Sequence, residues 1–286
     1  MPQKSRFGLL RSARRFDRWF RARPSRATLF AALVALGVSA ANAAPSTPSA
    51  LVSIIIDDLG NSLAQGRRVI ALPAPITLAI LPHTTHSNTL AVEATRARKE
   101  VLLHLPMQPV NDAAPGPGVI EITMPAREIG ATLDYDLSTV PHAIGVNNHM
   151  GSRVVQHDGA MRALLGAIRA RGNLFFVDSR TSAQSVAARV GRELGLPILE
   201  RDVFLDHDLD DRAIDARLNE LVAVARRRGY AIGIGHPHAK TFAALDAWLA
   251  TAASANIRVV PLSELLRHAL KETKHGERAG TAGPGV

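Results

Sequence analysis

Residues 51–60 read LVSIIIDDLG, an apolar run that ends on two adjacent carboxylates. The β-branched segment Ile54–Ile56 predicts a strand that is covered on both faces, as the strands of parallel sheets are. Asp57 and Asp58 follow directly, and successive side chains of an extended backbone point to opposite sides. One carboxylate could therefore bind a metal ion while its neighbour performs another task. In isolation, an Asp-Asp pair at a strand end is also typical of a turn or a helix cap.

Beyond this strand, short apolar runs alternate with helical stretches along the chain. This alternation predicts βα units around a parallel sheet, which is an α/β fold. Seven or eight such units favour an irregular (β/α) barrel over an open doubly wound sheet. No G-x-G-x-x-G follows a strand and no G-x-x-x-x-G-K-[ST] occurs, which argues against dinucleotide and P-loop folds. The predicted strands are Leu51–Ile56, Ile76–Leu81, Glu100–Leu103, Ala143–Val146, Asn173–Val177, Ile198–Leu205, Ala231–Ile234 and Ile257–Val260.

Helical periodicity is clear in four stretches between these strands. Three of them end directly before a glycine, which is the residue best suited to the left-handed position that terminates a helix. The helices are predicted at Gly159–Arg171, Ala183–Leu194, Asp210–Arg228 and Thr241–Ala255, with the caps at Gly172, Gly195 and Gly229.

Histidine and aspartate gather at the carboxyl ends of the predicted strands, the rim where parallel barrels build their active sites. Of the 11 histidines, seven lie within a few residues of a strand end. Neutral imidazole and carboxylate together suit zinc or a similar divalent metal. Polar residues also end strands for structural reasons alone, but that explains single cases better than a series. The rim residues are Asp57, Asp58, His83, His86, His104, His149, Asp178, Asp206, His207, His236 and His238.

The net charge of +9 is concentrated at the amino terminus, because residues 1–27 hold +8 of it. A nucleic-acid-binding domain needs a basic face in its folded part, so this distribution argues against a nucleic-acid partner. The absence of cysteine excludes thiol catalysis, disulfides and Cys-ligated metal sites.

The basic segment is followed by the apolar run Leu29–Ala41 and by Ala41-Asn42-Ala43, the pattern of a signal peptide with cleavage after Ala43. This run is shorter than the about 20 residues that span a bilayer. We expect a signal peptide at 1–43, a linker at 44–50, a folded domain at 51–270 and a disordered tail at 271–286. The folded domain would then be periplasmic or exported, with an uncleaved amino-terminal anchor as the alternative.

Several of these segments together resemble the divergent polysaccharide deacetylase family, which is similar to the carbohydrate esterase, or NodB-like, deacetylases. The resemblance covers about residues 50–268, and NNHMGS combined with the Asp-Asp strand end is a specific combination. It implies an irregular (β/α) barrel and a metal-dependent hydrolase, with zinc as the expected metal, that removes acetyl groups from a cell-envelope polysaccharide. The segments are IIIDDLG (54–60), LAILPH (78–83), EVLLHLPMQP (100–109), GVNNHMGSR (145–153), FVDSRTS (176–182), DVFLDH (202–207) and IGIGHPH (232–238).

The resemblance also implies roles for individual residues. Asp57 corresponds to the catalytic base and Asp58 to a metal ligand, while His236 of GIGHPH corresponds to the catalytic acid. His149 of NNHMGS corresponds to a metal-binding histidine.

Two departures from the wider group fall within the site. Its H-[ST]-x-x-H motif is reduced to His149, because Arg153 stands four residues later. We therefore assign the third metal ligand to His104 of LLHLPM, which ends a strand close in chain order. The Arg-x-Pro-Tyr substrate motif of the wider group is missing as well.

Three further residues are candidates for supporting roles. Asp178 could orient His236 or a ligand histidine, or it could cap the following helix. Arg153 and Arg180 could bind an anion beside the metal, which keeps open a hydrolase of phosphate or of another acyl group. The missing motifs favour a second alternative, a noncatalytic carbohydrate-binding or envelope-assembly relative that has kept the fold.

Overall fold

The computed structural model describes residues 50–281, and the side chains of residues 50–272. The predicted signal peptide and the linker up to residue 49 lie outside the described residues. Within the described range, none of the helices combines the length and the apolar character that crossing a membrane requires.

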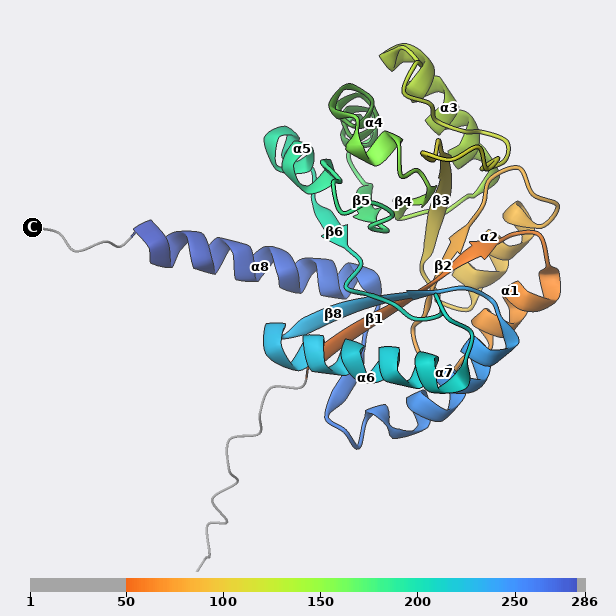
Figure 1. Cartoon of the computed structure of the whole chain (residues 1–286), viewed down its shortest axis with the longest axis vertical. Helices are drawn as coiled ribbons and strands as arrows, with labels where there is room; N and C mark the ends of the chain where they lie inside the picture. Colours follow the sequence, from red (N-terminus) through yellow and green to blue (C-terminus); the bar gives the residue numbers. More distant parts are fainter. Residues whose placement is uncertain (1–49, 282–286) are drawn as a thin grey trace, which may run out of the picture. The chain divides into compact units, whose positions relative to one another are not determined.

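One sheet of nine parallel strands forms the centre of the fold (Figure 1). Eight strands follow the order β6-β5-β4-β3-β2-β1-β8-β7, and β9 pairs with the start of β1. No pairing joins β6 to β7 among the described strands, so the sheet curls into a half-barrel that stays open at this seam. The strands are β1 (Ala50–Leu59), β2 (Thr77–Ile80), β3 (Val101–Met107), β4 (Gly145–Met150), β5 (Phe175–Asp178), β6 (Ile198–Glu200), β7 (Val203–Phe204), β8 (Tyr230–Gly235) and β9 (Ile257–Val259).

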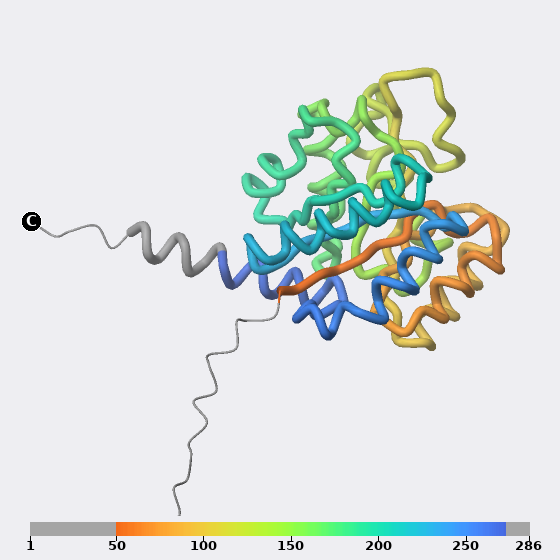
Figure 2. Tube along the Cα trace, turned by 60° about the horizontal axis from the view of Figure 1, so that its bottom comes forward, coloured from red at the N-terminus to blue at the C-terminus, as the bar shows by residue number. Residues whose placement is uncertain are grey.

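All helices except α8 lie on the outer side of this sheet, whereas the first turns of α8 pack against its inner side (Figures 1 and 2). Helices α3, α4 and α5 pack against one another in series, and α6 packs against α7. The helices are α1 (Leu63–Ile70), α2 (Ser87–Arg96), α3 (Ala126–Thr139), α4 (Asp158–Ala170), α5 (Ala187–Leu194), α6 (Asp211–Arg228), α7 (Ala239–Ala252) and α8 (Leu262–Thr281), with a short 3₁₀ turn at Val154–Gln156.

This architecture confirms the predicted α/β class and the irregular barrel, with two local corrections. The predicted strand 198–205 is two strands, because the chain crosses at Arg201 and Asp202 from β5 to β8. The tail predicted to be disordered from Lys271 is helical as far as Thr281, since α8 continues that far. The three predicted helix caps, Gly172, Gly195 and Gly229, all have the left-handed φ that glycine tolerates.

Two apolar layers show why the central strands are apolar throughout. Along β1, Ile54 and Ile56 pack in the cluster between the sheet and the helices, whereas Ile55 packs in the cluster inside the barrel. The inner cluster also contains Leu102, Val177, Ile232 and Ile234, each fully or almost fully buried. Leu262 and Leu265 of α8 belong to the same inner cluster.

The inner positions change from apolar to polar two residues further along the strands. Because alternate residues share a face, the side chain two positions after each inner apolar residue enters the same interior nearer the rim. Ile55, Leu102, Val177 and Ile234 are followed in this way by Asp57, His104, Ser179 and His236. The rim of the barrel is therefore polar, directly above an apolar floor.

One carboxyl group is buried away from the rim residues predicted as ligands. Asp136 shares the buried face of α3 with Ile129 and Leu133, and its side chain is 0% exposed. Its Oδ1 contacts His83 Nε2 at 2.7 Å, while its Oδ2 has no hydrogen-bond partner among the described residues. Burial raises the pKa of Asp136 to about 8.

This burial predicts a pH-dependent effect of Asp136→Asn. The native state retains a proton that the unfolded chain releases near pH 3.8, so the free energy of unfolding falls as pH rises toward 8. The amide of the variant does not titrate, so its free energy of unfolding does not fall in this way as pH rises. We expect the variant to be more stable by roughly 1–3 kcal/mol at pH 8.5 and to differ little at pH 5. Urea unfolding of both proteins at the two pH values measures it. An equal effect at both values would contradict the raised pKa.

Candidate metal centre

The end of β1 brings both of its carboxylates to the same cavity. Asp58 has a left-handed φ of 57°, and the register between β1 and β2 shifts between Ile56 and Leu59. This irregularity interrupts the alternation that the sequence predicted, so Asp57 and Asp58 do not point to opposite sides of the strand. Both line a cavity of about 470 Å³ at the rim. The environments of the two carboxylates nevertheless differ, because Asp57 is buried and Asp58 is half-buried.

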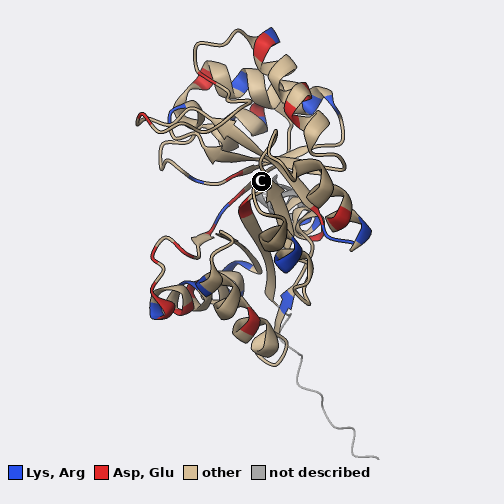
Figure 3. Cartoon of the chain, turned by 90° about the vertical axis from the view of Figure 1, so that its right-hand side faces the viewer, with Lys and Arg blue, Asp and Glu red and all other residues tan. Residues whose placement is uncertain are grey.

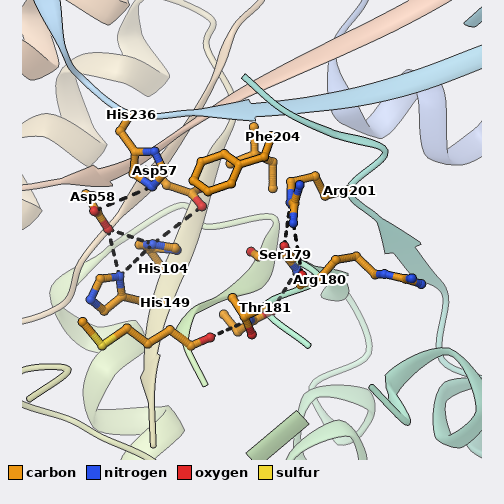
Figure 4. Close-up of a pocket in the computed structure, with 13 residues that line it drawn as sticks. Asp57, Asp58, His104, His149, Ser179, Arg180, Thr181, Arg201, Phe204 and His236 are labelled. Carbon is orange, nitrogen blue, oxygen red and sulfur yellow. Dashed lines mark hydrogen bonds and ion pairs between the residues drawn. The ribbon is translucent and has the colours of Figure 1, made fainter. Parts of the chain in front are cut away.

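Three predicted metal ligands converge in this cavity (Figure 4). Asp58 Oδ1 lies 2.8 Å from His149 Nδ1 and 3.1 Å from His104 Nε2. The two histidine nitrogens lie 3.2 Å apart. Neighbouring ligands of a tetrahedral zinc ion with bonds of about 2.0 Å are separated by roughly 3.3 Å, so the three atoms have a suitable spacing.

The positions of His104 and His149 follow from the pairing of β3 with β4. His104 pairs with Asn147 and Pro106 pairs with His149, so the two histidines are diagonal neighbours on adjacent strands. His104, Asn147 and His149 share the inner face, because alternate residues of a strand do. The third predicted ligand therefore lies on the neighbouring strand, and no histidine is needed at position 153.

Asn147 determines which nitrogen of His104 is free to bind. Its amide nitrogen donates to Asp57 Oδ1 at 2.8 Å, so its carbonyl oxygen faces His104 Nδ1 at 2.9 Å and must accept. Nδ1 of His104 therefore carries the proton, and Nε2 of the neutral ring presents a lone pair to Asp58. Such an outer partner fixes the tautomer of a metal-binding histidine. The sequence analysis did not identify Asn147, although its place two residues before His149 puts it on the same face.

The donor set fits a divalent metal. Although burial opposes it, hydrogen bonds with His104 and His149 hold the pKa of Asp58 well below its ordinary value. Burial lowers the pKa of His104, but the charges of Asp57 and Asp58 outweigh it and raise this pKa. The ring nitrogens and the carboxylate therefore stay together only with a cation among them, either a proton or a metal ion. One carboxylate and two imidazoles are a common ligand set for zinc.

Asp57 lies next to the three ligands without belonging to them. Its side chain is buried, and burial raises its pKa even though Asn147 and nearby histidines lower it. Its Oδ2 is 3.7 Å from His104 Nε2. A buried carboxylate with a raised pKa beside a metal site is suited to accept a proton.

His236 faces the same cavity from the end of β8, and Asp206 orients it. His236 Nδ1 lies 2.9 Å from Asp206 Oδ1, while its Nε2 points to Asp58 Oδ2 at 3.8 Å. Asp206 Oδ2 also accepts from the backbone of His236 and from Thr241 Oγ1. Burial lowers the pKa of His236, but the hydrogen bond with Asp206 and the charge of Asp57 outweigh it and raise this pKa to about 9.

Asp178 does not orient His236. Phe176 packs on the outer side of the sheet. Asp178, two residues further along the same strand, points to the same side, whereas His236 is on the inner side. Asp178 Oδ1 instead accepts from the backbone nitrogen of Arg180 at 2.8 Å. The carboxylate at the end of β7, Asp206, takes the predicted role because β7 is the neighbour of β8.

The predicted anion-binding arginines differ in position. Arg153 donates to the carbonyl oxygens of Pro109 and Val110 and does not line the cavity. Arg180 lines the cavity, but its guanidinium pairs with Glu200 at 2.8 Å. Arg201, which the sequence analysis did not identify, also lines the cavity.

The remaining rim histidines lie outside the cavity. His83 contacts Asp136 and stacks on Tyr135 at 4.2 Å between ring centroids. His207 is exposed, and so is His238, which directly precedes α7 as its N-cap residue. Asp206, His236 and His238 also form a group whose ligand atoms lie within 4.8 Å of one another, although both oxygens of Asp206 already accept hydrogen bonds.

Comparison with known proteins agrees with this architecture. The half-barrel is the NodB-like deacetylase fold. The chain belongs to the divergent polysaccharide deacetylase family, whose sequence profile matches residues 54–266.

The chain is 34% identical over 219 residues to the uncharacterised protein YibQ of Escherichia coli, covering 76% of this chain and 66% of that protein. It is 33% identical over 217 residues to an uncharacterised protein of Haemophilus influenzae, covering 76% of this chain and 77% of that protein. The structure of an uncharacterised protein from Agrobacterium tumefaciens has a TM-score of 0.73 at 27% identity, covering 77% and 90% of the two chains. Peptidoglycan deacetylase PdaC from Bacillus subtilis shares the fold with a TM-score of 0.50 at 11% identity, covering 83% and 99%.

The ligand geometry predicts about one zinc per chain. Asp58→Ala and His104→Ala each remove one of three donors, so both variants should lose the metal after dialysis. His238→Ala serves as the control, because His238 belongs only to the second group and should leave the zinc content unchanged. Elemental analysis of the purified proteins measures it. Full zinc in His104→Ala together with loss of zinc in His238→Ala would place the metal at the second group, and the assignment to Asp58, His104 and His149 would be wrong.

Proposed function

We propose that this protein is a metal-dependent hydrolase that removes acetyl groups from a cell-envelope polysaccharide. One observation carries the proposal: a proton acceptor, a metal-ligand triad and an oriented histidine all face one cavity. Asp57 is the acceptor, Asp58, His104 and His149 are the triad, and His236 is the oriented histidine. The family supports a deacetylase, and the geometry supplies the groups that this reaction needs.

Asp58, His104 and His149 would hold the metal. When bound, a divalent ion polarises the acyl carbonyl and lowers the pKa of water, which is the chemistry that hydrolysis requires. Zinc is the metal we propose, because the donors are one carboxylate and two imidazole nitrogens.

The proton transfers fall to Asp57 and His236. Asp57 accepts a proton from the attacking water at a carboxylate oxygen, which its burial makes more basic. His236, which is protonated near neutral pH, donates a proton from Nε2 to the departing amine or alkoxide. Asp206 holds Nδ1 of the ring and stabilises its charged form, so Nε2 keeps pointing into the cavity.

We propose the periplasm as the place of action. The amino-terminal pattern of a basic segment, a short apolar run and Ala-Asn-Ala supports export. A polysaccharide of the cell envelope is then the substrate within reach.

Acetate release tests the proposal. Zinc-loaded protein should release acetate from N- or O-acetylated oligosaccharides, and Asp57→Asn should reduce kcat by about 10²–10⁴-fold because the proton acceptor is lost. Asp206→Asn should reduce kcat by roughly 10–100-fold, as the loss of an orienting partner does.

Asp178→Asn is the matched control, since it makes the same change in a carboxylate on the other side of the sheet. All three variants should keep their zinc. No acetate release by the zinc-loaded wild type above the Asp57→Asn level would favour the noncatalytic alternative.

A further inference from the structure

Arg201 lies where the chain crosses the open seam of the half-barrel. Its backbone nitrogen donates to the carbonyl of Asp178 in β5, and the next nitrogen, of Asp202, donates to Ile232 in β8, both at 2.9 Å. The crossing thus connects the two sides of the sheet between β6 and β7. It places the Arg201 side chain on the wall of the cavity that contains the metal ligands.

The guanidinium of Arg201 is held in one orientation (Figure 4). Its Nε donates to the Ser179 carbonyl at 2.7 Å, and its Nη2 donates to the Arg180 carbonyl at 3.1 Å. Its Cζ lies over the ring of Phe204, 5.0 Å from the ring centre. One edge of the guanidinium is therefore occupied by these two hydrogen bonds. Its Nη1 and the second hydrogen of Nη2 have no protein acceptor among the described residues.

Arg201 is also a half-buried cation without a paired anion. Basic and acidic side chains are interspersed over the helices of the described chain (Figure 3). Two further arginines, which line a second cavity together with Arg201, are both paired. Arg180 pairs with Glu200 and Arg228 pairs with Asp202, both within 2.8 Å. No carboxylate of the described residues forms an ion pair with Arg201. Burial lowers its pKa, and Asp57, Asp178 and Asp202 counter this only at longer range.

Metal binding would leave the charge of Arg201 uncompensated. A divalent ion at Asp58 offsets the negative charges of Asp57 and Asp58, and the Arg180 charge is already offset by Glu200. The loaded cavity then has a net positive charge on the wall formed by Arg201. A pre-oriented guanidinium with free donors binds planar carboxylates and phosphates well, since both accept two hydrogen bonds.

We propose that the substrate carries an anionic group, a carboxylate or a phosphate, close to its acetyl group, and that Arg201 binds this anion. This inference rests on the proposed function and names its substrate class: an acidic acetylated sugar. The cavity volume of about 470 Å³ accommodates one sugar ring with both substituents. Arg201 is a specificity residue here, because it contacts the anion and not the reacting carbonyl.

Three sugars that differ in one substituent test the inference: N-acetylglucosamine, its 6-phosphate and N-acetylmuramic acid, which carries a carboxylate. Calorimetry with zinc-loaded protein should show at least about tenfold tighter binding of one acidic sugar than of the neutral one, as a charge-assisted hydrogen bond gives. The better of the two acidic sugars identifies the anion. Arg201→Gln should abolish this preference and leave the affinity for N-acetylglucosamine unchanged.

Two further variants keep the test decisive. Arg162→Gln makes the same charge change on the outer face of α4, where Arg162 pairs with Glu193, and should keep the full preference. Arg201→Lys retains the positive charge but lacks the planar guanidinium, so it should keep part of the preference for the acidic sugar. It also provides a test if Arg201→Gln does not fold. Zinc content, measured for each variant, reports whether the site is intact.

The outcomes separate this inference from the proposed function. Equal binding of neutral and acidic sugars by the wild type, or an equal loss for both in Arg201→Gln, would overturn the inference even if acetate is released. A preference for the acidic sugar that depends on Arg201 would support it even if no acetate is released, and the proposed hydrolysis alone would then be wrong.

Discussion

The rim of this barrel depends on three electron-pair donors brought to one point. Asp58 Oδ1, His104 Nε2 and His149 Nδ1 lie 2.8 to 3.2 Å apart, and none of them can satisfy the other two without a cation. The backbone irregularity at Asp58, the register of β3 with β4 and the Asn147 contact to His104 all serve this convergence. A site of this kind is costly without a cation, because converging acceptors repel one another in a half-buried place.

Much of this arrangement could be predicted from the sequence, because the carboxyl ends of parallel strands meet at one edge. That rule places Asp58, His104 and His149 on one rim although they are distant in the chain, and the resemblance to the deacetylase family selects Asp58 and His149 among the rim residues. The lost histidine at position 153 did not prevent the prediction, since a metal requires donors at a point in space and not at a fixed spacing. His104 meets this requirement from the adjacent strand.

What the sequence could not show is strand order and local backbone geometry. Asp178 and Asp206 are equally plausible partners of His236 until the pairing of β7 with β8 is known. The face of Asp178 was hidden as well, because β5 is apolar on both sides and its alternation does not reveal the interior. The left-handed backbone of Asp58 has no signal in an Asp-Asp pair, although aspartate tolerates this conformation better than most residues.

The open seam connects the fold to selectivity. A closed barrel would bury its interior behind paired strands, but here β6 and β7 are separated and joined by a short crossing at Arg201 and Asp202. The crossing uses its backbone to hold β5 and β8, which leaves the Arg201 side chain free to line the cavity. Arg201, one of the two residues that split the predicted strand into two, thus supplies a fixed positive charge beside the predicted metal ligands. Because that charge is built into the crossing, the proposed anion preference of the cavity follows from the topology of the half-barrel.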